Sequence, residues 1–207
     1  LRTDVQQDIE KINALIINRQ EVLAAAKKAV FDVEVNGFKK SDIVQYRNLL
    51  RSAYYWSYFE PTTANLDQII NSGSLRYFKN KDLIKAISNY RNSINVVASR
   101  NEREKQYFYD VMQPMVINHL NLAPMDTVHF TGDITPKDFF YKIDSGLINI
   151  RTKDLVLFDN HPETKFKVLN AFRSFGVNLS NTIRISSKPF LKEAENLIEL
   201  LNKELEE

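Results

Sequence analysis

The chain has 207 residues, of which 43% are hydrophobic and 26% charged, and this size and composition are enough to bury a core. The net charge of +2 gives no general attraction to nucleic acid or to anionic membranes, so such a partner would need a local patch. Because the chain has no cysteine, disulfides, thiol nucleophiles and cysteine-ligated zinc are excluded. Only five glycines and six prolines interrupt the sequence, which favours long helices.

The first thirty residues predict one long amphipathic helix. Its apolar stripe follows helical spacing and consists of Leu1, Val5, Ile9, Ile12, Ile16, Leu23, Ala26 and Val30. Arg19 occupies the one place in the stripe where an apolar side chain is missing. The stripe drifts little over about four heptads, which indicates coiled-coil-like packing along a partner helix. We expect Gly37 to end this helix in the left-handed conformation.

A second helix is expected over residues 42–59, with Pro61 ending it. Its last turns carry more aromatic side chains than one helix face can hold, namely Tyr54, Tyr55, Trp56, Tyr58 and Phe59. They fit a bundle core with hydroxyls reaching the rim, a stacking platform for a ligand, or a belt at a membrane interface. A short helix is expected after Pro61, with Leu66, Ile69 and Ile70 facing inward.

A long helix is predicted from Asn80 onward, with Asn80 as its cap, and residues 98–106 interrupt its apolar stripe with polar side chains. Either the helix projects there or its partner is charged. We interpret Glu102 and Glu104, which stand among basic residues, as part of a solvated face with local ion pairs rather than as an acid–base pair. Pro114 is expected to kink or end the helix.

Residues 121–160 are the irregular part of the sequence, with one short strand expected at 127–130. An apolar pattern of helical spacing then runs from Phe166 to Leu205. It predicts either one helix kinked around 186–189 or two collinear helices, the second capped by Ser187. The sequence therefore predicts an all-α fold: one elongated antiparallel helical-bundle domain over 1–207, with coiled-coil-like N- and C-terminal helices and an irregular insertion at 121–160. We expect the N- and C-terminal helices to pair with each other.

The order of these features resembles an uncharacterised bacterial family of single-pass membrane-anchored helical proteins, a domain of unknown function. The residues that carry the resemblance are "LRTDVQQDIEKINALI", an F-x-P break, "INSGSLRYFKNKDL" and "LKEAENLIELLNKEL". It implies that this chain is the part outside the membrane, anchored to the inner membrane of the cell envelope through a helix before Leu1, and located in the periplasm. It implies no activity and no catalytic residue.

The stretch from Asn71 to Leu83 combines a turn with three basic residues, Arg76, Lys79 and Lys81. Together with Tyr54, Tyr55, Trp56 and Tyr58 they form the candidate interaction surface, for a protein partner or for self-association. Residues 76–105 hold eight basic against three acidic side chains, a composition that could attract nucleic acid or acidic lipids. No nucleic-acid motif accompanies these charges, so nucleic acid is not the expected partner.

The sequence carries no recognisable catalytic, cofactor-binding or metal-binding motif. We therefore expect a non-enzymatic domain that takes part in protein–protein interaction or scaffolding. One alternative is a sensor-like bundle that binds a small ligand, indicated by the surplus of tyrosines. A second is a metal-dependent hydrolase, in which Asp126, His129 and Asp133 would ligate the metal if their loop folded back.

Overall fold

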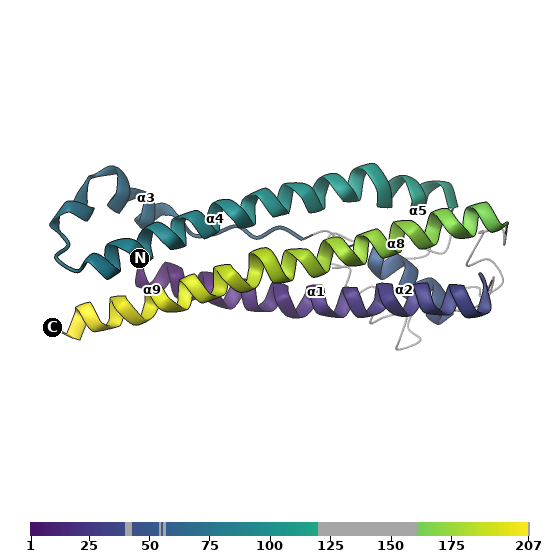
Figure 1. Ribbon diagram of the computed structural model, residues 1–207, viewed down its shortest axis with the longest axis horizontal. Coiled ribbons are helices and arrows are strands. Elements are labelled where there is room, and N and C mark those ends of the chain that lie inside the picture. Colours follow the sequence, from purple (N-terminus) through teal and green to yellow (C-terminus); the bar gives the residue numbers. More distant parts are fainter. Residues whose placement is uncertain (40–42, 54, 56, 120–160, 207) are drawn as a thin grey trace, which may run out of the picture. The chain divides into compact units, whose positions relative to one another are not determined.

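The computed structural model describes residues 1–39, 43–53, 55, 57–119 and 161–206 (Figure 1). Every secondary-structure element within these residues is a helix and no strand occurs, so the predicted all-α bundle is confirmed. The chain forms two compact units: unit 1 comprises Leu1–Gln20, Ser57–Lys105 and Leu179–Glu207, and unit 2 comprises Glu21–Trp56 and Gln106–Asn178. The predicted insertion at 121–160, with its short strand, lies outside the described residues, and a single domain over 1–207 stays a prediction.

Three long helices build unit 1. They are the first part of α1 (Arg2–Asn36), α4 (Lys81–Tyr107) and the segment formed by the end of α8 (Pro162–Thr182), the π-turn η4 (Ile183–Ser187) and α9 (Lys188–Glu206). α9 runs antiparallel to α4, since Asn80, just before α4, bonds to Glu204 near the end of α9. Arg19 of α1 reaches both Glu104 and Ser187, so the predicted pairing of the N- and C-terminal helices occurs within this unit.

The core of unit 1 is formed by the apolar stripes of these helices. Its buried members are Val5, Ile12, Ile16, Phe59, Leu66, Leu83, Ala86, Ile87, Tyr90, Ile94, Val97, Ile183, Phe190, Ala194 and Leu197. Three aromatic rings lie at its centre: Phe59 and Phe190 meet edge to face with centroids 4.9 Å apart, and Tyr90 lies 5.4 Å from Phe190. Edge-to-face ring pairs add to the free energy gained from burial alone.

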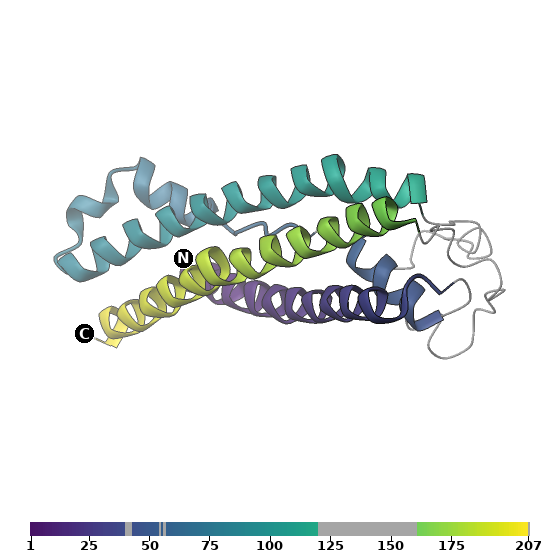
Figure 2. The same cartoon turned by 45° about the vertical axis from the view of Figure 1, so that its right-hand side comes forward.

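The connection from α2 to α4 differs from the prediction. α2 (Ile43–Ala53) ends before the aromatic run, and residues 57–63 are not helical, so a helix to Phe59 is wrong. α3 (Ala64–Asn71) and the 3₁₀ turn η1 (Ser74–Tyr77) follow, and both views place α3 beside the first part of α4 (Figures 1 and 2). Gly73 separates α3 from η1 with φ of 69°. Asn80 caps α4 as predicted, because its Oδ1 accepts the N–H groups of Asp82 and Leu83 at 3.1 Å.

Two π-turns each lie two residues before a proline. η4 precedes Pro189, and η2 (Phe108–Met112) precedes Pro114. In each turn the N–H of the following residue bonds back five positions, Lys188 to Ile183 and Gln113 to Phe108. Because a proline ring would clash with the carbonyl four residues earlier, the wider turn lets the helix pass the proline unbroken. The segment from Pro162 to Glu206 is thus one continuous helical path, and Ser187 is not a cap.

Unit 2 contains the rest of α1 and α8, together with α2, η2 and α5 (Gln113–His119). Gly37 ends α1 with φ of 70°, as predicted. The turn into α2 is held by buried Gln45, whose amide donates to Asp32 at 2.8 Å and to the Gly37 carbonyl at 3.0 Å. Tyr107 donates its hydroxyl to the Ala171 carbonyl at 2.9 Å and thereby ties α4 to α8 within this unit.

Candidate functional site

Residues 57–63 form an extended strap in unit 1 that is held by side chains of the helices. Because the strap has no ladder of its own, its backbone groups need other partners. Asn101 Nδ2 donates to the Phe59 carbonyl at 2.9 Å, and the Thr62 N–H donates to the Asp8 carboxylate at 3.0 Å. Lys11 Nζ donates to Thr62 Oγ1 at 3.1 Å. The strap is therefore fixed at both ends by polar groups of α1 and α4.

Asp8 is fully buried and serves as the anchor of the strap. Besides the Thr62 N–H it accepts the Tyr90 hydroxyl at 2.7 Å and lies 3.5 Å from Lys11 Nζ. Burial raises the pKa of Tyr90, and the hydrogen bond to Asp8 and its negative charge raise it further. The tyrosine thus stays a neutral donor, and the carboxylate is occupied by structural partners.

Tyr58 is the described member of the predicted aromatic surface in unit 1, and 50% of it is exposed. It borders a groove of about 660 Å³, which we call the Tyr58 groove. The lining residues are Lys11, Ala14, Leu15, Tyr58, Phe59, Glu60, Pro61 and Thr62. The groove thus combines an apolar floor and an aromatic ring with one cation and one anion.

The predicted basic residues lie elsewhere in unit 1. Arg76 stacks on the ring of Tyr77, 4.8 Å from its centroid, and donates to its hydroxyl at 2.9 Å. Lys79 and Lys81 are exposed. Lys81 is the first residue of α4, whereas Asn101, which holds the strap, lies between five and six turns later, about 30 Å along the axis. The structure therefore does not unite Tyr58 with the basic residues in one surface.

The remaining predicted residues give less information. Tyr55 belongs to unit 2 and is half-buried, while Tyr54 and Trp56 lie outside the described residues. Asp126, His129 and Asp133 lie outside them as well, so the metal hypothesis stays a prediction. Among residues that are described, no group of three or more histidines and carboxylates is placed to hold a metal ion.

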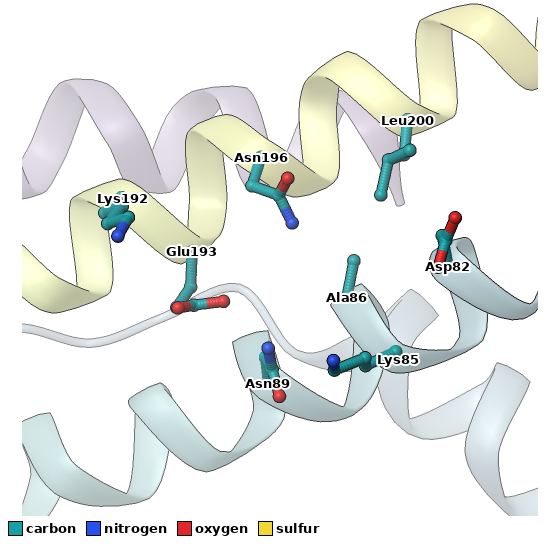
Figure 3. Close-up of a pocket in the computed structure, with 8 residues that line it drawn as sticks. All are labelled: Asp82, Lys85, Ala86, Asn89, Lys192, Glu193, Asn196 and Leu200. Atoms are coloured by element: carbon teal, nitrogen blue, oxygen red, sulfur yellow. The ribbon is translucent and has the colours of Figure 1, made fainter.

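A second groove of about 430 Å³ lies between α4 and α9 (Figure 3). Four charged side chains of balanced sign line it: Asp82 and Lys85 from α4, and Lys192 and Glu193 from α9. Asn89 and Asn196 add amide groups, and the view shows the Asn196 amide directed across the groove toward α4. No sequence pattern indicates this site, because its two sets of residues are separated by about a hundred positions or more and only the antiparallel pairing of α4 with α9 brings them together.

A buried polar layer crosses the three long helices of unit 1, and we call it the Arg19 layer: Arg19, Asn101, Glu104, Ser186 and Ser187. The side chain of Arg19 is completely buried, and its guanidinium donates to Glu104 Oε2 at 3.0 Å and to Ser187 Oγ at 3.1 Å. This finding corrects the solvated-face interpretation for Glu104, which is only 6% exposed, whereas Glu102 fits it with an exposed contact to Lys105. The apolar stripe of α4 is interrupted by polar residues there because α1 presents the charged side chain of Arg19 to it.

Comparisons of the chain with protein-family models, with curated proteins and with solved structures found no match. Of the helices that are described, none combines the length and the apolar character needed to cross a membrane.

Proposed function

We propose that this chain is a non-enzymatic helical domain that binds a protein partner, or a second copy of itself, through the Tyr58 groove. The observation that supports it most is the half-exposed ring of Tyr58 on a strap that is bonded at both ends. Aromatic side chains dominate the binding energy of many interfaces. A ring on a fixed backbone loses little conformational entropy when a partner covers it.

The neighbours of Tyr58 support the same role. Phe59 is 1% exposed and anchors the strap in the core, so the adjacent residue is held at the surface. Glu60 at the rim of the groove adds an exposed carboxylate, and its charge gives orientation to a polar partner. We infer from the resemblance that this domain lies in the periplasm, as part of an inner-membrane-anchored protein of the bacterial envelope.

Site-specific photo-crosslinking in cells that produce the full-length protein tests the proposal. A photoreactive phenylalanine replaces Tyr58 in one variant and Tyr77 in a matched variant, since Tyr77 is also an exposed tyrosine of unit 1, 72% accessible, but lies outside the groove. We expect a discrete protein adduct from position 58 and none from position 77. Equal labelling at both positions, or no adduct at 58, contradicts the proposal.

A small-ligand sensor is the second candidate, supported by the groove between α4 and α9. The four charged side chains of this groove make no ion pair within the described residues, so all of them are available to a ligand. They are Asp82, Lys85, Lys192 and Glu193. Balanced charges of this kind suit a zwitterionic molecule such as an amino acid. Thermal-shift measurements with amino acids and dipeptides test this, with Lys192→Gln as the variant that should lose any shift; the absence of a shift with all compounds contradicts it.

A further inference from the structure

Four buried polar atoms of the Arg19 layer have no hydrogen-bond partner among the described residues. They are Arg19 Nε, Asn101 Oδ1, Glu104 Oε1 and Ser186 Oγ. Each belongs to a side chain that is more than nine-tenths buried. Buried polar groups are almost always paired in native proteins, because an unpaired group loses its hydration without replacement. Four such atoms in one layer therefore indicate partners other than the side chains already described.

The chemistry of the free atoms identifies the class of partner. Arg19 Nε–H can only donate, Glu104 Oε1 and Asn101 Oδ1 can only accept, and the Ser186 hydroxyl can do either. The charges of Arg19 and Glu104 already balance across a 3.0 Å contact, so an added ion would be buried without a counter-charge. A small neutral molecule that both donates and accepts fits this set, and water is the smallest of this kind.

The geometry of the ion pair shows where such a molecule would bind. Nε and Nη2 of an arginine share one edge of the guanidinium, and that edge can hold both oxygens of a carboxylate. In unit 1, Arg19 Nη2 donates to Glu104 Oε2. The neighbouring atoms Arg19 Nε and Glu104 Oε1 have no hydrogen-bond partner among the described residues. A donor–acceptor bridge between these two atoms completes the pair.

The π-turn η4 contributes the two serine hydroxyls of the layer. Ser186 and Ser187 are consecutive in η4, but only Ser187 bonds to Arg19. Both are buried, and the widened turn presents two hydroxyls to the same layer. Short π-turns inside α-helices often occur at functional sites.

We propose that the Arg19 layer is a binding site for ordered water in the interior of unit 1. One water accepts from Arg19 Nε–H and donates to Glu104 Oε1, and the Ser186 hydroxyl and Asn101 Oδ1 are its further partners or those of a second water. The layer is then a hydrated ion pair, whose polar groups are satisfied only when solvent occupies it.

Magnetic relaxation dispersion of water oxygen measures this directly, because it counts water molecules held inside a protein for long times. We expect Arg19→Met/Glu104→Met to lose about one or two such waters relative to the native protein. The matched control is Arg184→Met/Glu195→Met, which removes the same two side-chain types from exposed positions of unit 1 and should lose none. An unchanged dispersion in the Arg19→Met/Glu104→Met variant overturns the proposal.

Two further measurements keep the test decisive if that variant folds poorly. Ser186→Ala removes one hydroxyl from the layer and should also reduce the slow water component; no change there counts against the site. A high-resolution crystal structure should show water within hydrogen-bond distance of Arg19 Nε. If Glu104 Oε1 instead bonds directly to Nε and no water lies in the layer, the proposal is wrong.

Discussion

The loss of Arg19 should destabilise unit 1 strongly, because it leaves the Glu104 carboxylate buried without its counter-charge. Glu104 is 6% exposed and has its only described hydrogen-bond partner in Arg19, and Ser187 loses a donor in the same step. Removing one partner of a buried ion pair costs about 3–5 kcal/mol. For a chain of this length each kcal/mol lowers Tm by about 2–4 °C. Arg19→Met should therefore lower Tm by roughly 6–20 °C.

The double substitution Arg19→Met/Glu104→Met shows whether the unpaired charge of Glu104 or the lost packing of Arg19 causes the loss of stability. Replacing both partners of a buried pair with apolar residues of similar volume is often neutral or stabilising, by about 1–4 kcal/mol. We therefore expect this variant to recover most or all of the lost stability. Urea unfolding followed by circular dichroism gives the free energies, with Arg184→Met as the exposed control expected to change stability by less than about 0.5 kcal/mol.

Two results would refute the reasoning. One is a loss below about 1 kcal/mol for Arg19→Met, since it would mean that Glu104 reaches solvent or another partner. The other is a loss of unfolding free energy in Arg19→Met/Glu104→Met that equals the sum of the losses in the two single variants. Such additivity would show that the two charges do not stabilise each other.

Three other predictions concern the strap and its surroundings. Phe59→Ala should cost about 3–5 kcal/mol in urea unfolding, against about 0.5 kcal/mol or less for its exposed neighbour in Tyr58→Ala; equal effects would contradict the buried anchor. Gly73→Ala should cost about 1–2 kcal/mol, because φ is 69° while open space surrounds the added methyl group; a neutral result would mean that the turn relaxes. Stability should fall as pH rises above the ordinary tyrosine pKa of 10.0, since folded Tyr90 keeps a proton that the unfolded chain loses, and this contribution is complete below that pH. Tyr90→Phe should flatten the alkaline fall, and an unchanged pH profile would contradict the raised pKa of buried Tyr90.

The helical fold was predictable because most of it is local. The α1 stripe appears in the sequence with its gap at Arg19, and both Gly37 and Asn80 perform the predicted roles at helix ends. Glu104 was interpreted as solvated, yet its burial was predictable, because Leu83, Ile87, Tyr90, Ile94, Val97, Asn101 and Glu104 alternate at spacings of four and three. The stripe on α4 thus continues through its polar section, and a stripe position is the signal that separates buried Glu104 from exposed Glu102.

The strap was not predictable in the same way. Five of the six residues at 54–59 are aromatic, a composition compatible with a helix, whereas the strap is held by contacts distant in sequence: the Phe59 ring meets Phe190 edge to face, and Asn101 donates to the Phe59 carbonyl. One local signal was available, since the residue before a proline avoids the helical conformation, and this applies to Glu60. The groove between α4 and α9 had no local signal, because only tertiary packing creates it.

The π-turn η4 also determines where this helix can lose a residue without a change in its packing. The buried positions Leu179, Ile183 and Ser187 are spaced by four, one residue more than the usual alternation would need, and Phe190 and Ala194 then resume it. The turn therefore holds one surplus residue without shifting the face that α9 presents to the core. Deleting one exposed residue there, such as Ile185, would convert the π-turn to a regular turn and leave α9 in phase, whereas deletions elsewhere in α9 would rotate its apolar face away from the core.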